Sequence, residues 1–147
     1  MSSSITLHAT SVVFCGRGLL LRGPSGAGKS DLALRLIDAG GTLIADDYTN
    51  VHVHENHLIA SSPDTIKGMM EVRGVGLLAM PYLIKARLDL VVDCESHERI
   101  ERLPAVIHTE IHSEIQGIRL RLLTLYPFES SAVAKLRALL QNKLTNE

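Results

Sequence analysis

The sequence predicts an α/β domain with a central sheet and flanking helices. Three observations carry this prediction. Short apolar runs bounded by turn residues recur along the chain, as expected of strands. Two longer stretches, residues 31–39 and 130–143, have the composition and apolar spacing of helices. A glycine-rich loop at residues 23–30 lies between a buried strand and the first of these helices.

The length and composition favour a single domain spanning residues 1–147. A chain of this length buries roughly 68–70% of its unfolded surface in one core. The formal net charge is −1, so no basic surplus favours nucleic acid or an anionic membrane as a partner. The N-terminus lacks a signal-peptide pattern, and no apolar run is long enough to span a bilayer. Cys15 and Cys94 lack metal-binding spacing, which favours buried thiols in a cytoplasmic protein.

The first elements are predicted to be three short strands and a helix. The strands are expected at residues 5–8, 11–14 and 18–22, with a turn signal at residues 16–18. The helix at residues 31–39 should end at Gly40 and Gly41, because glycine favours the conformation that terminates a helix.

The rest of the chain continues the sheet and ends in a second helix. Apolar runs of strand length recur at residues 42–45, 51–54, 58–60, 88–92 and 117–125. A turn at residues 55–56 predicts a hairpin between the second and third of these runs. The helix at residues 130–143 is expected to begin at a Ser130 or Ser131 cap and to cover the sheet with its apolar face.

The glycine-rich loop fits G-x-x-x-x-G-K-[ST], the phosphate-binding P-loop, at every fixed position. Its residues are Gly23, Pro24, Ser25, Gly26, Ala27, Gly28, Lys29 and Ser30. A strand, a glycine loop and a helix N-terminus in this order form an anion site, because backbone N–H groups and the helix dipole face the ligand. Lys29 is expected to reach the β- and γ-phosphates, and the Ser30 hydroxyl to bind Mg²⁺.

Carboxylates follow two of the predicted strands. Asp46 and Asp47 come directly after residues 42–45, where an α/β sheet binds its ligands. A P-loop kinase needs acids there to hold Mg²⁺ and to accept the proton of the attacking hydroxyl. Asp93 ends the run at residues 88–92 in the same way, and spacing alone leaves the choice between the two strand ends open.

A further stretch combines a charged pair with a glycine turn: Glu71-Val72-Arg73-Gly74-Val75-Gly76. Together with the P-loop and the paired aspartates, it resembles the signature of the HPr kinase/phosphorylase family. Members of that family phosphorylate a serine on HPr, the small phosphocarrier protein of the phosphotransferase system. The resemblance runs from about His8 to Val92 and is to the catalytic C-terminal domain, in a short single-domain form. It implies a P-loop kinase domain of the HPr kinase type.

The resemblance also implies roles for individual residues and a set of ligands. Lys29 grips the phosphates of ATP, and the Mg²⁺ site includes Ser30, Glu71 and Asp47. Asp46 is the expected base toward the acceptor serine, with Asp47 beside it in the catalytic group. The expected acceptor is HPr or its nitrogen-type relative, and a homo-oligomer, specifically a hexamer, is implied.

Three other basic residues are candidates on the same grounds. His8 is expected near the aspartates, where it would tune their charge, and Arg73 is expected to steady the signature loop. Residues 79–87 depart from the family, which has a glycine-rich loop with a functional arginine there. Arg87 is the candidate for that arginine, and the reverse phosphorylase activity is left open.

Two alternatives to the carrier-protein kinase remain: a P-loop kinase for a small metabolite, and a nucleotide-binding regulatory module without catalysis. Phosphate transfer to a protein serine separates the carrier-protein kinase from the metabolite kinase, and tight nucleotide binding without any transfer would support the regulatory module. His52, His54 and His57 cluster around the predicted hairpin, where a solvated strand face is favoured over a metal site because no Cys or acid completes a ligand set.

Overall fold

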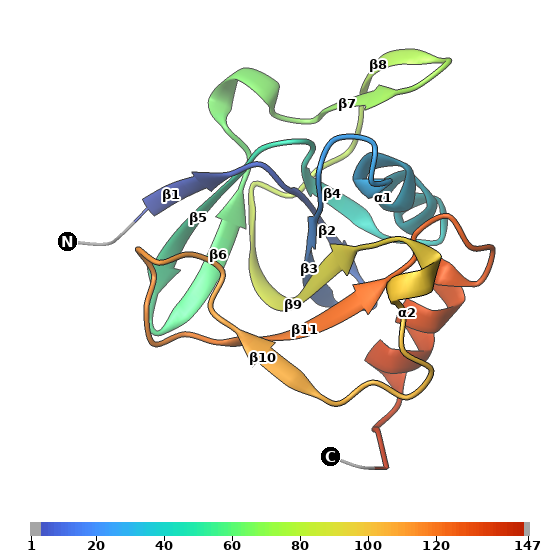
Figure 1. The fold of residues 1–147 in the computed structure, drawn as a ribbon. Coiled ribbons are helices and arrows are strands. Elements are labelled where there is room, and N and C mark those ends of the chain that lie inside the picture. The colour runs from blue at the N-terminus through green and yellow to red at the C-terminus, as the bar shows by residue number, and fades with distance from the viewer. Residues whose placement is uncertain (1–3, 146–147) are drawn as a thin grey trace.

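The computed structural model describes residues 4–145 as a mixed β-sheet covered by two helices (Figure 1). The main sheet contains β1 (Ser4–Leu7), β2 (Thr10–Phe14), β3 (Arg17–Arg22), β4 (Thr42–Ala45), β5 (Thr49–His54), β6 (His57–Ser61), β9 (Lys85–Cys94), β10 (Ile107–Thr109) and β11 (Leu120–Leu125). The remaining elements are a separate hairpin of β7 (Met69–Val72) and β8 (Gly76–Ala79), the helices α1 (Lys29–Asp38) and α2 (Ala132–Gln141), and the 3₁₀ turns η1 (Asp64–Ile66) and η2 (His97–Arg99).

The strand order of the main sheet is β1-β5-β6-β9-β3-β2-β4, and β11 also pairs with β9 and carries β10. The long strand β9 belongs to both halves of this sheet. Its first residues, 85–87, pair with β6, whereas the residues from Leu88 onward pair in parallel with β3 and β11. The sheet therefore folds over at β9, and its two halves face each other.

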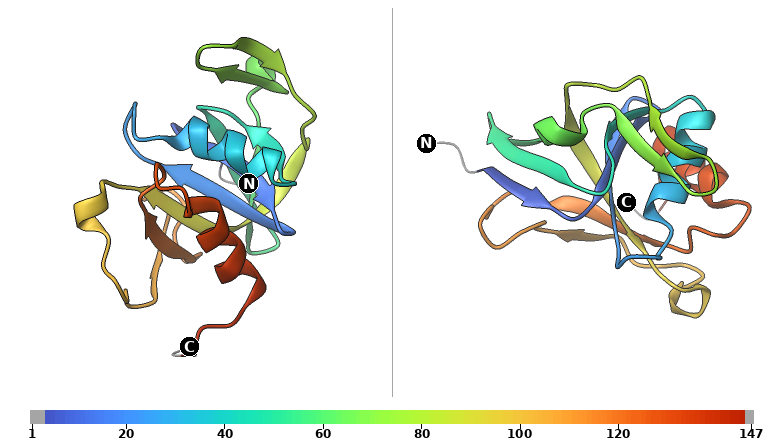
Figure 2. Two further views of the ribbon diagram at one scale, coloured as in Figure 1. Left: turned by 90° about the vertical axis from the view of Figure 1, so that its right-hand side faces the viewer. Right: turned by 90° about the horizontal axis from the view of Figure 1, so that it is seen from above.

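Alternation along β3 shows how the core is divided. Leu19 and Leu21 pack with the apolar faces of α1 and α2, whereas Leu20 packs with Val51 and Leu58 from the other half of the sheet. Successive side chains of a strand point to opposite faces, so one fully buried strand separates two apolar layers. Figure 2 shows the two helices against the strands and the β7–β8 hairpin standing off from the rest.

A glycine permits the close approach of β3 and β9. A Cβ atom at Gly18 would lie 2.0 Å from the carbonyl oxygen of Arg87, at the point where β9 passes from one half of the sheet to the other. The Gly18 amide also donates to Asp89 Oδ2 at 3.0 Å. A larger residue here would push the two central strands apart.

The predicted α/β fold is confirmed, with differences at several element ends. The turn before β3 is formed by Cys15 and Gly16, so Arg17 and Gly18 already belong to the strand. The predicted strand at residues 88–92 is longer, because β9 begins at Lys85 and continues through Asp93 to Cys94. The strand β10 was not predicted at all, since its three residues give too short a pattern. No helix within residues 4–145 is both long and apolar enough to cross a membrane.

Candidate active site

The P-loop connects β3 to α1, as the sequence predicts. Gly26 and Gly28 have φ angles of 83° and 101°, which favour glycine because a side chain would clash with its own backbone. Within the loop, the Ala27 amide donates to the Pro24 carbonyl at 3.0 Å. Figure 1 shows the loop at one end of the sheet, beneath the β7–β8 hairpin. This curled backbone opens directly into the first turn of α1, where the helix dipole favours an anion.

Lys29 is the first residue of α1 and is buried with its amine inside the loop. Its side chain is 6% exposed, and Nζ donates to the carbonyl oxygens of Gly23 at 2.5 Å and Pro24 at 3.2 Å. A buried ammonium requires hydrogen-bond acceptors, and these two carbonyls supply them. The same amine is placed to exchange a carbonyl for a phosphate oxygen bound in the loop.

The chain turns sharply after β4 and separates its two aspartates. The Tyr48 amide donates to the Asp46 carbonyl at 2.7 Å, and Asp47 has a φ of 68°. Aspartate tolerates this left-handed conformation better than most residues. As a result, Asp46 is directed inward with 8% of its surface exposed, whereas 57% of the Asp47 side chain is exposed.

Asp46 is tied to the P-loop and to the signature stretch. Ser30 Oγ donates to Asp46 Oδ1 at 2.8 Å, and Thr10 Oγ1 donates to the same oxygen at 3.3 Å. The backbone amide of Glu71 donates to Asp46 Oδ2 at 3.4 Å. Three donors from separate segments therefore hold this carboxylate beside the serine hydroxyl at the end of the P-loop.

Asp47 has a different partner on the outer side of the turn. His8 Nε2 lies 2.8 Å from Asp47 Oδ1, and the His8 ring stacks on Tyr48 with centroids 5.0 Å apart. The Asp47 amide donates to Thr10 Oγ1 at 3.1 Å, which fixes the backbone of the turn. The structure thus gives Asp47 an oriented, solvent-accessible carboxylate beside a histidine.

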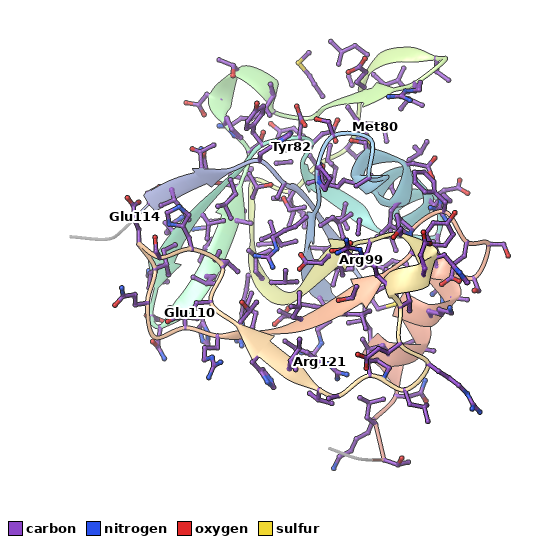
Figure 3. All side chains as sticks on the ribbon, in the orientation of Figure 1. Met80, Tyr82, Arg99, Glu110, Glu114 and Arg121 are labelled. Carbon is purple, nitrogen blue, oxygen red and sulfur yellow. The ribbon has the colours of Figure 1, made fainter. Side chains whose placement is uncertain are left out.

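Glu71 and Arg73 lie on the β7–β8 hairpin above the P-loop. Both residues are exposed, and the backbone amide of Glu71 is the group of this pair that donates to Asp46. The hairpin is held at its base by the Met80 amide, which donates to the Gly68 carbonyl at 2.7 Å. Figure 3 labels Met80 and Tyr82 at this base.

Arg87 and Asp93 are not part of this constellation. Arg87 lies at the start of β9, near His57 at 3.5 Å and Asp89 at 3.4 Å. The P-loop follows the other end of β3, next to Asp93, and the six residue steps along the strand from Arg87 to Asp93 span about 20 Å. The placement of Arg87 at the site is therefore corrected: β9 holds it at the far end of the sheet.

Asp93 lies at the P-loop end of β9, but its carboxylate forms an ion pair with a neighbouring arginine. Arg22 Nε donates to Asp93 Oδ1 at 2.7 Å, and the second guanidinium nitrogen donates to Oδ2 at 3.1 Å. A bidentate pair uses both carboxylate oxygens and fixes their orientation. Asp46 thus contacts Ser30, whereas Asp93 is paired with Arg22, and this geometry favours the end of β4 as the acidic side of the site.

The oxygen atoms around Ser30 fit a magnesium ion. Mg²⁺ prefers oxygen ligands and is held in kinases by one or two carboxylates together with substrate phosphates and water. Ser30 Oγ and Asp46 Oδ1 supply such atoms side by side, with the Glu71 backbone adjacent. Within residues 4–145 no three His, Cys, Asp or Glu side chains, those of the β5–β6 hairpin included, form a group that could hold a metal ion by themselves.

Cys94 lies directly beneath the loop. A Cβ at Gly23 would be 3.2 Å from the Cys94 carbonyl oxygen and 3.4 Å from its Cβ. Burial raises the pKa of the Cys94 thiol to about 11, against a smaller lowering by the Lys29 charge. This thiol is therefore neutral at ordinary pH and packs as a small apolar group.

Two contributors to the site escaped prediction. Thr10 is fully buried and bonds to both aspartates, although nothing in its sequence context distinguishes it from other strand hydroxyls. Arg35, on α1, donates to the carbonyls of Pro127 and, at 3.4 Å, Glu129. Its spacing on the helix is visible in the sequence, but its partners are more than ninety positions away.

The fold and the site together define an α/β P-loop domain of the kinase type, with an acidic strand end beside the loop. The sequence profile of the family described as "HPr Serine kinase C-terminal domain" matches residues 1–136. The chain belongs to this family.

Known relatives and a solved structure agree with this placement. The chain is 36% identical to an HPr kinase/phosphorylase of Clostridium tetani over 126 residues, covering 81% of this chain and 41% of that protein. It is 33% identical to the HPr kinase/phosphorylase of Caldicellulosiruptor bescii over 127 residues, with the same coverage of 81% and 41%. The chain thus spans about two fifths of the length of these curated relatives. The structure of the Hpr(Ser) kinase/phosphatase from Coxiella burnetii superposes with a TM-score of 0.80 at 25% identity, covering 94% of this chain and 95% of that chain.

Proposed function

We propose that this chain is an ATP- and Mg²⁺-dependent protein-serine kinase whose acceptor is HPr or a nitrogen-type HPr. One observation carries the proposal: the P-loop serine contacts a buried aspartate at 2.8 Å, and the next residue presents an accessible carboxylate. A kinase of this class needs both groups, one on the metal side and one toward the acceptor hydroxyl. The family membership of residues 1–136 supports the same activity.

In this proposal the phosphates of ATP lie in the P-loop. Lys29 neutralises phosphate charge from inside the loop, and backbone N–H groups at the start of α1 complete the cradle. Ser30 and Asp46 would hold Mg²⁺, with Glu71 close by. The ion, when bound, neutralises charge that develops on the phosphates during transfer.

The acceptor serine approaches from the exposed side of the turn after β4. Asp47 takes the proton of the serine hydroxyl, and the serine oxygen then bonds to the γ-phosphorus. The bond between that phosphorus and the β–γ bridging oxygen breaks, and ADP leaves. His8 is a positioning residue in this scheme, because its ring nitrogen contacts the Asp47 carboxylate at 2.8 Å.

The roles of the two aspartates are therefore exchanged relative to the expectation from the sequence. The sequence predicts Asp46 as the base, with Asp47 beside it in the catalytic group and also on the metal side. The inward orientation of Asp46 beside Ser30 favours the metal side, and the exposure of Asp47 favours contact with a bulky protein acceptor. Arg73 is retained as a residue that steadies the signature hairpin.

Large apolar side chains are exposed on the β7–β8 hairpin and in the segment that follows it. Val75 and Leu77 of the hairpin and Ile84 in that segment are 70%, 62% and 73% exposed. Contiguous exposed apolar patches are typical of protein–protein contacts. The hairpin is therefore available to an acceptor protein or to a second copy of the chain. A homo-oligomer, with a hexamer as its specific form, is part of the proposal and is tested by light scattering.

The decisive experiment is phosphate transfer to purified carrier proteins. The chain is incubated with labelled ATP, Mg²⁺ and either HPr or nitrogen-type HPr, and the labelled residue is mapped by mass spectrometry. Label on one serine of a carrier supports the proposal, whereas nucleotide binding without transfer to either carrier contradicts it. Addition of inorganic phosphate to the labelled carrier then measures the reverse, phosphorylase reaction on the same material.

A further inference from the structure

The turn after β11 lies against the P-loop. A Cβ at Gly28 would be 2.9 Å from both Phe128 Cζ and Pro127 Cγ, so these side chains contact the backbone of the loop. Pro127 is buried, whereas Phe128 is 53% exposed. One part of the Phe128 ring therefore packs on the loop, and the rest faces solvent beside the phosphate site.

Phe128 belongs to a chain of aromatic rings, which we call the aromatic turn: His97, Tyr126 and Phe128. Tyr126 meets Phe128 edge-on with centroids 6.0 Å apart, and His97 meets Tyr126 edge-on at 5.6 Å. Only 3% of the residues are aromatic. Phe128 is the ring of this group that touches the P-loop, and its exposed face, backed by Tyr126, is a surface available for stacking.

The aromatic turn is fastened to the helix that begins at the P-loop. The Arg35 guanidinium donates to the Pro127 carbonyl and, at 3.4 Å, to the Glu129 carbonyl. The Glu129 carboxylate in turn binds Lys135 of α2 at 2.5 Å. These bonds fix the turn in place relative to α1. The conformational entropy lost when a ligand stacks on the turn is therefore small.

The sheet order places this turn on the side of the P-loop away from the aspartates. In the order β11-β9-β3-β2-β4, Asp46 follows β4 at one side of β3, and the aromatic turn follows β11 at the other. In P-loop kinases the metal bridges the β- and γ-phosphates. The Ser30–Asp46 pair therefore marks the γ-phosphate end, and the nucleoside is directed toward β9 and β11. Arg99, labelled in Figure 3, belongs to η2 at this edge.

We propose that the aromatic turn binds the adenine base of ATP, with the exposed face of Phe128 as the stacking surface. This inference rests on the proposed nucleotide-dependent function and adds the site of the base to it. Stacking on an aromatic ring is available to any base, because every base has a π-face. The site thus contributes affinity, while the P-loop supplies the phosphate contacts.

Two ligands separate the base site from the phosphate site. Calorimetry with Mg²⁺ compares ATP with inorganic tripolyphosphate, which has the phosphates but no base. For Phe128→Ala we expect ATP affinity to fall between about 5-fold and 150-fold, the range of a lost base–aromatic stack, with tripolyphosphate affinity unchanged. Phe128→Tyr keeps the ring and should restore ATP affinity to within about twofold of the wild type.

A fluorescent reporter tests proximity directly, because the chain contains no tryptophan. Phe128→Trp places a single indole at the stacking position, and its emission should change with ATP but not with tripolyphosphate. Leu103→Trp is the matched control, since Leu103 is 85% exposed and lies outside the turn. Its emission should respond to neither ligand.

The outcomes distinguish this inference from the function on which it rests. If Phe128→Ala loses affinity for ATP and tripolyphosphate to the same extent, the ring only supports the conformation of the P-loop, and the proposed base site is overturned. Unchanged affinity for both ligands would overturn it as well. If the wild-type chain binds neither ligand, then the P-loop function itself fails, and the base site fails with it.

Discussion

Replacement of Asp47 by asparagine separates the two carboxylates after β4 by function. Asparagine keeps the size of the side chain and an oxygen for the His8 contact, but it loses the basic oxygen. Because 57% of the Asp47 side chain is exposed, the substitution should leave folding and nucleotide binding unchanged. A positioned general base contributes about 10²–10⁴-fold to a rate, which corresponds to about 2.7–5.4 kcal/mol of barrier. We expect kcat for carrier phosphorylation to fall by that factor.

Asp46→Asn should behave differently, because Asp46 lies beside Ser30 and receives three hydrogen bonds. Loss of its charge should weaken Mg²⁺ binding, so the Mg²⁺ concentration needed for the half-maximal rate should rise by about 10- to 100-fold, the usual effect of disturbing a metal site. Part of the rate should return at high Mg²⁺. Asp93→Asn is the control: its carboxylate is engaged by Arg22, so transfer should stay within about tenfold of wild type.

The assay measures initial rates of labelled-phosphate transfer at saturating ATP over a range of Mg²⁺ concentrations, with the same carrier for all variants. The ATP-induced change in Tm is recorded for each variant to confirm nucleotide binding. A normal rate for Asp47→Asn, with Asp46→Asn inactive at every Mg²⁺ concentration, would refute the exchanged roles. An inactive Asp93→Asn would refute the choice of strand end.

Three further predictions concern the P-loop lysine, the close approach of β3 and β9, and the buried thiol beneath the loop. ATP at 100 times its Kd should raise the Tm of a chain of this size by about 5–10 °C. Lys29→Ala should fold but lose this rise, as measured by scanning fluorimetry. A retained rise would contradict the P-loop assignment. Gly18→Ala should destabilise the fold by about 3 kcal/mol or more in denaturant unfolding, because its Cβ would lie 2.0 Å from the Arg87 carbonyl oxygen, and wild-type stability would show that the strands can separate freely. Burial raises the pKa of the Cys94 thiol from 9.0 to about 11, so at pH 8 Cys94 should react with iodoacetamide roughly a hundredfold more slowly than an ordinary thiol, and faster as the pH rises toward that pKa. Mass spectrometry of the treated native protein measures the rate at each cysteine. Equal rates at Cys94 and Cys15 would contradict the burial of Cys94.

Much of the fold could be predicted because its signals are local. Apolar runs bounded by turn residues located β2, β3 and β4 within a residue of their observed ends. The helix after the P-loop was also expected, because a P-loop requires one and Gly40 and Gly41 end it. Short or composite elements were harder to predict: β10 has three residues, and β9 joins two halves of the sheet through positions that resemble a loop in sequence.

The phosphate-binding loop is the part of the site that the sequence determined by itself. In a P-loop the contacts to phosphate come from consecutive backbone groups, so eight adjacent residues specify the motif with little help from the rest of the chain. The glycines at positions 26 and 28 have the positive φ angles that such a loop demands. Nothing beyond the flanking strand and helix is needed to predict this function.

The acidic part of the site required the tertiary structure. Asp46 and Asp93 follow similar apolar runs. Only the folded chain shows that Ser30 contacts Asp46, whereas Arg22 pairs with Asp93. The orientation of Asp46 and Asp47 depends on a left-handed turn and on Thr10 from another strand.

The same reason removes Arg87 from the site and brings Phe128 to it. Arg87 is close in sequence to the signature stretch, but β9 carries it to the far end of the sheet, whereas Phe128 is a hundred positions from Gly28 and touches it. A local motif fixes the conformation of its own backbone. Side-chain partners from distant segments are fixed only by strand order and register, which arise when the whole core packs together.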